Sequence, residues 1–238
     1  MPTISSNIAR INESILEAAA ISNFPEKVTL VAVSKGHSFD KIIEAFNAGI
    51  INFGENYLQE ALNKKLHLEE FAIQWHFLGP IQSNKCRLIA ENFDWVHSVD
   101  RIKVMKLLND FRPSNAPPLN ICIQINSSGE DTKSGIAMND AQSHLTDLVS
   151  ALKELPKLKL RGIMSIPSNT ENIDQVINEF KSMYKLYTEL KKQINTVDTL
   201  SMGMSNDYAL AIEHGSNLVR IGTAIFGARE IKIKGSDN

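Results

Sequence analysis

Cysteine is scarce in this sequence. The 238 residues include two cysteines, Cys86 and Cys122, and neither lies in a Cys-x-x-Cys pair or at metal-ligand spacing from histidines. We interpret both as small buried apolar side chains, which suits a reducing compartment. The six histidines show no His-x-His or His-Glu-x-x-His pattern, so no metal site is expected. The Gly-x-Ser-x-Gly nucleophile elbow and the Walker-type phosphate loop are absent as well.

The sequence also lacks an excess of positive charge and a long apolar run. Its formal net charge is -2, whereas nucleic-acid binding needs clustered basic residues. The longest basic runs are pairs such as Lys64-Lys65 and Lys191-Lys192, which we interpret as solvated helix faces. No segment approaches the roughly 18 apolar residues of a membrane span, and no signal peptide pattern is found. The sequence therefore predicts a soluble cytoplasmic protein without nucleic-acid or membrane partners.

The sequence does contain a regular alternation of short β-branched runs and amphipathic segments of helical period. We expect eight strands, over 28–34, 50–55, 73–79, 95–99, 119–126, 158–166, 199–203 and 218–222. The expected helices between them are 38–48, 56–66, 83–91, 100–111, 139–154, 171–194 and 206–214.

Strands that alternate with helices predict a parallel sheet, which can be open or closed. The count of eight and the chain length favour an α/β fold of the (β/α)8 TIM barrel type. An extra N-terminal helix at about 3–19 is expected to cap one end of the barrel. The Pro-rich segment 112–118 is interpreted as a surface turn, and residues 1–238 are predicted to form one domain.

In such a barrel, functional groups gather at the C-terminal ends of the strands. Lys35 directly follows the apolar run 28–34. At the barrel mouth it would be partly desolvated, and desolvation favours the neutral amine, which is the species that forms imines. A surface lysine at a strand end would give the same local sequence.

Two further segments suggest an anion site. Ser201, Gly203 and Ser205 precede an expected helix, where free backbone N–H groups and the helix dipole attract anions. Simple N-capping would give the same pattern. Gly222 and Thr223 follow the eighth expected strand and can bring backbone amides close to a phosphate. The loops after strands seven and eight are the usual phosphate site of such barrels. Both candidate segments lie in these loops, which favours a phosphate ligand.

Arg220 lies in an otherwise apolar strand. An inward arginine needs an acceptor because an unpaired buried charge is costly. A pyridine nitrogen and the carboxylate of Glu55 are both possible acceptors, and the sequence leaves the choice open. His76 is a plausible wall residue if a cofactor lies above the barrel, whereas we interpret His97 as a hydrogen-bonded core group.

Several segments closely resemble the pyridoxal phosphate homeostasis proteins, and the similarity runs from about residue 5 to residue 230. They are VAVSKGHS (31–38), INFGENYLQEAL (51–62), WHFLGPIQSNK (75–85), LRGIMSI (160–166), LSMGMSNDYALAI (200–212) and VRIGTAIFGAR (219–229). The resemblance implies a barrel similar to the N-terminal domain of alanine racemase, and pyridoxal 5′-phosphate (PLP) as the cofactor.

The resemblance also implies roles for individual residues. Lys35 would carry PLP as a Schiff base, and Arg220 would face the pyridine nitrogen. The residues implied to hold the phosphate are Ser205, Gly222 and Thr223, with the amides around Gly203. Those implied to line the ring are Asn56, His76, Met164 and Ser201, and Ser165 belongs to the same predicted set.

Two loops compare with the family in different ways. The segment 130–135 looks like a loop of alanine racemase, with Lys133 where the family usually keeps a lysine. After the first strand, many members read SKTKP, whereas this chain has Gly36-His37 in the middle of that motif. The second family lysine is therefore replaced by His37, which could take over some of its role near neutral pH.

The choice between enzyme and carrier depends on a second acid–base group. Racemisation needs one on each face of the substrate α-carbon, and Lys35 can supply only one. In alanine racemases a tyrosine from a second domain supplies the other, and no such domain follows the last strand motif here. The four tyrosines fall in expected helices or helix starts, and none is an obvious second base: Tyr57, Tyr184, Tyr187 and Tyr208.

An arginine beside the pyridine nitrogen also keeps that atom unprotonated, which weakens the ring as an electron sink. The sequence therefore predicts a monomeric, non-enzymatic PLP binder that buffers the cofactor or delivers it to apo-enzymes. A weak PLP-dependent amino-acid racemase is the alternative. A cofactor-free enzyme acting on a sugar phosphate is a third, more remote reading.

Overall fold

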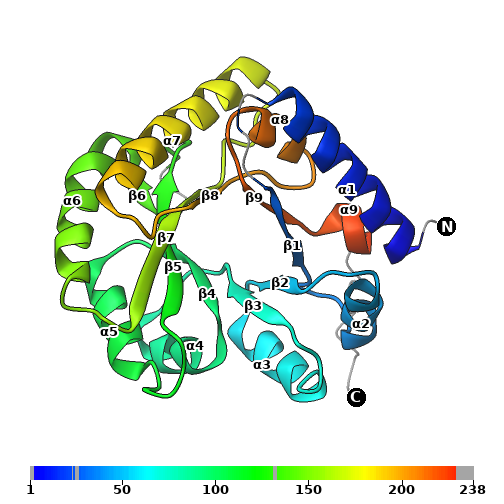
Figure 1. The fold of residues 1–238 in the computed structure, drawn as a ribbon, viewed down its shortest axis with the longest axis horizontal. Coiled ribbons are helices and arrows are strands. Elements are labelled where there is room, and N and C mark those ends of the chain that lie inside the picture. The colour runs from blue at the N-terminus through cyan, green and yellow to red at the C-terminus, as the bar shows by residue number, and fades with distance from the viewer. Residues whose placement is uncertain (1–2, 23, 25–26, 131–132, 229–238) are drawn as a thin grey trace, which may run out of the picture.

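A closed ring of eight parallel strands forms the centre of the molecule (Figure 1). The computed structural model describes residues 3–22, 24, 27–130 and 133–228. The ring strands are β1 (Thr29–Val33), β2 (Asn52–Glu55), β3 (Gln74–Phe77), β4 (Trp95–Val99), β5 (Leu119–Asn126), β7 (Leu158–Ser165), β8 (Thr199–Ser201) and β9 (Leu218–Ile221). Their order is β4-β3-β2-β1-β9-β8-β7-β5, and a pairing of β4 with β5 closes the ring. The predicted (β/α)8 barrel is confirmed.

Helices surround the ring, as the amphipathic segments predict. They are α1 (Ile4–Ile21), α2 (Phe39–Asn47), α3 (Leu58–His67), α4 (Cys86–Asn92), α5 (Ile102–Phe111), α6 (Ala141–Leu152), α7 (Ile173–Gln193) and α8 (Tyr208–Glu213). The expected helix 83–91 begins as a short 3-10 turn, Ser83–Lys85, before α4. A second 3-10 turn, Met138–Asp140, precedes α6.

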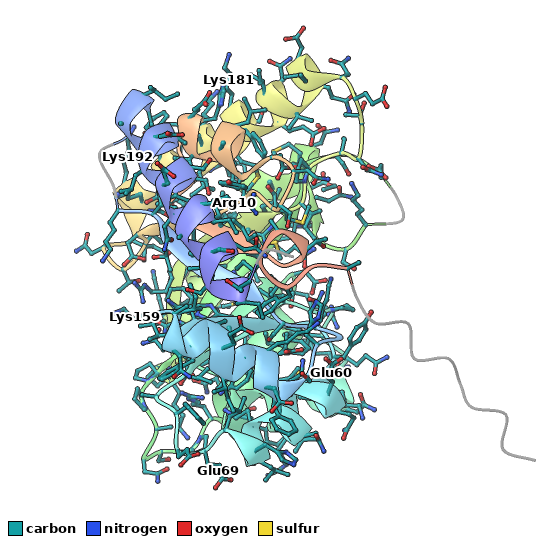
Figure 2. The ribbon with its side chains drawn as sticks, turned by 90° about the vertical axis from the view of Figure 1, so that its right-hand side faces the viewer. Arg10, Glu60, Glu69, Lys159, Lys181 and Lys192 are labelled. Atoms are coloured by element: carbon teal, nitrogen blue, oxygen red, sulfur yellow. The ribbon has the colours of Figure 1, made fainter. Side chains whose placement is uncertain are left out.

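The N-terminal helix α1 packs on the flank of the barrel and not across one end, so the expected capping position was wrong (Figures 1 and 2). The side-chain amide of Asn7 in α1 donates from Nδ2 to the carbonyl of Ile225 at 2.9 Å. The backbone N–H of Ile4 donates to Glu44 Oε1 in α2 at 3.1 Å. The apolar stripe of α1 is buried there, where the helix packs against α8, α9 and α2.

Two short elements escaped the sequence prediction. Strand β6 (Ile136–Ala137) pairs with the end of β5, outside the ring, and helix α9 (Thr223–Phe226) follows β9. Neither is long enough to show a hydrophobic period. Helix α9 begins at Thr223, with Gly222 as its N-cap residue.

The barrel strands are buried on both faces, as parallel strands covered by helices must be. All residues of β9 are buried, and only one residue of β5 is partly exposed. Gly162 permits close contact between β7 and β8, since a Cβ there would lie 1.7 Å from the Thr199 carbonyl oxygen. Both cysteines are buried as predicted, and burial raises the pKa of Cys122 to about 12.

The expectation of a solvated helix face for the Lys64-Lys65 pair was wrong. Lys64 is only 5% exposed, and Lys65 is half-buried against the ring of Trp75. Both occupy positions that continue the buried spacing of Leu58 and Ala61 along α3. Among the described residues, no helix combines the length and the apolar character that a bilayer crossing would need.

Candidate functional site

A cavity of about 1040 Å³ opens at the C-terminal ends of the barrel strands. It brings together residues from the ends of β1, β2 and β7 and from the loops after β8 and β9. Seven of the residues predicted from the sequence line it: Lys35, Asn56, Met164, Ser205, Arg220, Gly222 and Thr223. The sequence order separates them by almost 190 positions, and the closure of the barrel places them around one space.

Arg220 is the buried cation of this cavity. Its side chain on β9 donates from Nη1 to Ser201 Oγ at 2.6 Å and from Nη2 to the Ser165 carbonyl at 2.8 Å. Burial lowers the pKa of Arg220 to about 10, so the guanidinium is still charged at neutral pH. Glu55 is not its partner, because that carboxylate pairs with Lys64 at 2.7 Å.

A chain of hydrogen bonds continues from Arg220 across the barrel interior. Ser201 Oγ lies 3.1 Å from His97 Nδ1, and His97 Nε2 lies 2.9 Å from His76 Nδ1. His76 Nε2 then lies 3.1 Å from Asn52 Oδ1. Burial lowers the pKa of His76 to about 3 and the pKa of His97 well below its usual value, so both rings are neutral.

Neutral histidines give this chain one consistent direction. Asn52 Oδ1 only accepts, so His76 donates from Nε2 and accepts at Nδ1. His97 therefore donates from Nε2, and its Nδ1 accepts from the hydroxyl of Ser201, whose oxygen accepts from Arg220. Every donor along this chain of hydrogen bonds has an acceptor, which is why two adjacent buried imidazoles, tilted by 49° to each other, are tolerated. His97 was predicted to be a hydrogen-bonded core group, and this prediction is confirmed.

The loops after β8 and β9 form the phosphate candidate. The Ala224 N–H donates to Ser205 Oγ at 3.4 Å, which joins the two loops. Gly203 has a φ of +94°, and a Cβ there would lie 2.8 Å from Ala211 Cβ. Helices α8 and α9 are short, so an anion at this position would depend more on hydroxyl and amide donors than on long helix dipoles.

An unpaired buried oxygen atom at the mouth fits a polar ligand. Within the described part of the chain, Asn56 Oδ1, on a residue that lines the cavity, has no hydrogen-bond partner, and neither has Ser165 Oγ, on a residue that does not line it. Buried polar atoms are nearly always paired, and an exception needs an explanation. A ligand with hydroxyl, phosphate or amine groups in the adjoining cavity would satisfy such atoms, so the residues present are compatible with PLP.

Not every predicted site residue reaches the cavity. Four of them are buried and do not line it: His76, Ser165, Ser201 and Gly203. The Gly203 carbonyl accepts from the Arg220 N–H at 3.0 Å. His76 is connected to Arg220 only through His97 and Ser201, and it is not part of the cavity wall in this structure.

Two further predicted positions lie at the cavity. His37 lines it, and its ring centroid is 5.1 Å from that of Phe226. Lys133 donates from Nζ to Glu130 Oε1 at 2.7 Å and to the Pro167 carbonyl at 2.8 Å. The neighbouring residues 131 and 132 of the predicted loop lie outside the described residues.

The sequence analysis missed Asp207 and did not foresee that Tyr208 lines the cavity. Asp207 Oδ1 accepts from the Met204 N–H at 2.6 Å, and burial raises the pKa of Asp207. The only signal was position, since both residues lie within three positions after the segment 201–205. That signal is shared with ordinary helix starts, so it does not identify cavity residues without the fold.

The barrel and the residues at its mouth define a member of the alanine racemase N-terminal domain class. The family model described as alanine racemase, N-terminal domain, matches residues 7–230. The pyridoxal phosphate homeostasis protein of Vibrio alginolyticus is 47% identical over 235 residues, covering 97% of this chain and 99% of the relative. The chain belongs to the pyridoxal phosphate homeostasis protein family.

Solved structures show the same relationship. PipY of Synechococcus elongatus, without PLP, is 32% identical with a TM-score of 0.82 and covers 94% of this chain and 100% of its own. A second PipY structure, with PLP bound, has a TM-score of 0.80. Alanine racemase of Corynebacterium glutamicum is 15% identical with a TM-score of 0.65, covering 91% of this chain and 61% of its own. This last likeness shows the shared fold alone.

Proposed function

We propose that this chain binds PLP at the barrel mouth through Lys35 and holds it for buffering or delivery to apo-enzymes. The observation that carries the proposal is the single cavity that collects a lysine, a buried arginine and the two loops suited to a phosphate. The PLP-bound structure of the relative PipY supports it.

The chain's own residues would divide the binding between them. The Lys35 amine condenses with an aldehyde and releases water, while Arg220 donates an N–H towards a ring nitrogen. Ser205, Gly222 and Thr223 offer hydroxyl and amide donors for a phosphate, and Asn56 and Met164 border the ring position. When bound, PLP supplies a reactive aldehyde and an electron-accepting ring.

The structure favours a carrier over an efficient catalyst. Exposed residues, among them Met204, Asn206 and Thr223, form part of the cavity lining, so water reaches the site, whereas PLP enzymes usually exclude it. Ser201 orients Arg220, so the residue that faces the pyridine nitrogen would be an arginine N–H donor and not a carboxylate.

One observation favours the racemase alternative. Tyr208 lines the same cavity as Lys35, and a tyrosine is a possible second acid–base group. The racemase hypothesis predicts exchange of amino-acid α-protons with solvent deuterium, lost in both Lys35→Ala and Tyr208→Phe. Absence of exchange across the common amino acids would eliminate it.

The proposed site is tested by covalent labelling. The purified protein is incubated with PLP, scanned for visible absorbance, reduced with borohydride and mapped by peptide mass. We expect the pyridoxyl mass on the peptide that holds Lys35 and its loss in Lys35→Ala, with Lys133→Ala as the control from the same cavity. A label on another lysine, or none, would overturn the assignment.

Delivery is tested separately from binding. The PLP-loaded protein, not treated with borohydride, is mixed with an apo-transaminase. It should lose PLP to the transaminase, which should gain activity although the PLP-loaded protein is not denatured. Retention of the cofactor under these conditions would favour storage and contradict delivery.

A further inference from the structure

A cluster of charged side chains lies buried behind the loop that carries Lys35. It consists of Lys64 and Glu60 of α3 together with Glu55 at the end of β2. The Lys64 side chain is 6% exposed, that of Glu55 is 0% exposed and that of Glu60 is 30% exposed. None of these residues lines the cavity, and the binding mode proposed above does not use them.

Lys64 has three well-placed acceptors for its three N–H donors. Nζ donates to the Ser34 carbonyl at 2.7 Å, to Glu55 Oε1 at 2.7 Å and to Glu60 Oε1 at 2.6 Å. An ammonium group has three N–H bonds, so this ammonium is fully used. Burying a charged lysine has a large desolvation free energy, and three hydrogen bonds to the ammonium group restrict its partners to a narrow geometry.

The cluster forms hydrogen bonds with the peptide groups on both sides of Lys35. The Ser34 carbonyl, which belongs to the peptide group before Lys35, accepts from Lys64 Nζ. The Gly36 N–H, which belongs to the peptide group after Lys35, donates to Glu60 Oε1 at 2.6 Å. Because the two peptide planes determine φ and ψ of Lys35, the cluster fixes the direction of its Cα–Cβ bond.

Ser34 adds a third connection. Its hydroxyl donates to Glu55 Oε1 at 2.6 Å, and its backbone N–H donates to the Gly54 carbonyl at 3.0 Å in the neighbouring strand. The backbone at Gly36 has a φ of +75°, and the chain turns at Lys35 and Gly36. The backbone of the lysine is therefore held on both sides of its Cα.

We infer that Lys64, Glu60 and Glu55 position Lys35 so that its amine meets the cofactor aldehyde. The three are positioning residues, since they act through the backbone of Lys35 and do not touch the cavity. This inference rests on the proposed role of Lys35. It predicts that the cluster controls how fast the imine link forms, in addition to any effect on stability.

The experiment measures the rate of link formation with PLP by stopped-flow absorbance, far below each variant's unfolding temperature. Lys64→Met should slow it about tenfold or more, since a small misplacement of a reacting group has large kinetic effects. Lys65→Met is the matched control, because Lys65 is the next residue on α3 and contacts Trp75 and Phe93, not the Lys35 loop. It should keep the wild-type rate.

If Lys64→Met does not fold, a second pair of variants tests the same inference. Glu60→Ala removes the acceptor of the Gly36 N–H and should slow link formation, whereas Glu60→Gln retains an Oε1 acceptor and should restore most of the rate. Glu69→Ala, on an exposed residue beyond the end of α3, is the control (Figure 2).

The outcomes separate the two proposals. If folded Lys64→Met and Glu60→Ala form the link at the wild-type rate and lose only thermal stability, the cluster is purely structural and the inference is wrong. If borohydride labels no residue, or a residue other than Lys35, in the wild type, the proposed function itself fails. Slow rates in both variants with Lys35 still labelled would support the positioning role.

Discussion

Arg220 Nη1 and Ser201 Oγ are joined by a 2.6 Å hydrogen bond at the floor of the cavity. This bond links the buried cation to the neutral pair His97 and His76, and so to the interior of the barrel. The orientation of Arg220 is therefore set by residues that do not line the cavity.

Removal of the Ser201 hydroxyl should test that link. Ser201→Ala leaves Arg220 Nη1 without an acceptor and His97 Nδ1 without a donor, and unpaired buried polar groups cost about 1–3 kcal/mol. Urea denaturation should show a loss of that size together with weaker PLP binding. Ser182→Ala, whose hydroxyl bonds to the Asn178 carbonyl on an exposed helix face, should change stability by less than about 0.5 kcal/mol. Equal effects of the two substitutions on stability and PLP binding would contradict the hydrogen-bond link from Arg220 through Ser201 to His97.

The two buried histidines should make the unfolding free energy depend on pH. The pKa of His76 is about 3 in the folded state and about 6.5 in the unfolded state, so the unfolded state binds more protons between these values. Stability is complete above pH 6.5 and falls as the pH decreases, by up to about 1.4 kcal/mol per pH unit for each such histidine.

Comparison of variants isolates this effect from the titration of carboxylates. Denaturation curves between pH 5 and pH 7 should give a smaller slope for His76→Gln than for the wild type. His144→Gln, at an exposed position, should keep the wild-type slope. A wild-type stability that does not change over this range would mean that the histidines are not buried in the neutral form.

Glycine at position 203 should be required for space as well as for backbone conformation. Gly203 has a φ of +94° and a Cβ there would lie 2.8 Å from Ala211 Cβ, whereas Gly129 has a φ of +70° and nothing within 4 Å. Gly129→Ala should cost about 1–2 kcal/mol from the positive φ, and Gly203→Ala about 1–3 kcal/mol more from crowding. Denaturant midpoints would measure both, and equal costs would show that the Ala211 contact relaxes easily.

Asn56 should contribute to ligand binding and not to the stability of the apo-protein. Its Oδ1 is buried without a partner among the described residues, so Asn56→Leu should leave apo-stability unchanged or raise it. PLP affinity should fall by about fivefold, the equivalent of one lost hydrogen bond. Fluorescence titration would measure the affinity, with the exposed Asn63→Leu as control. A clear loss of apo-stability would instead indicate a structural partner for Asn56.

Periodicity predicted most of the framework. Each of the eight expected runs became a ring strand, with β4 and β5 matching residue for residue. The predicted position of Lys35 after β1 and of Gly222 and Thr223 after β9 followed from the same pattern. The pattern failed for α9, because four residues are too few to show a period.

Charged residues were harder to interpret than strands. Lys64 was read as solvent-exposed because lysine usually is, and its burial follows from acceptors supplied by Glu55, Glu60 and the Ser34 carbonyl. Glu60 and Glu55 lie four and nine residues before Lys64, but the Ser34 carbonyl lies 30 residues away, and local spacing does not show that all three meet one buried ammonium group. For the same reason Glu55 was considered a partner of Arg220.

The sequence by itself determined the class of fold, the family and seven of the residues that line the cavity at the barrel mouth. These properties depend on local patterns: apolar period, glycine and hydroxyl positions, and a lysine at a strand end. Only the tertiary structure decided which polar groups meet. Arg220 meets Ser201, and Lys64 meets the peptide groups on either side of Lys35, because closure of the barrel brings distant strand ends within hydrogen-bond distance.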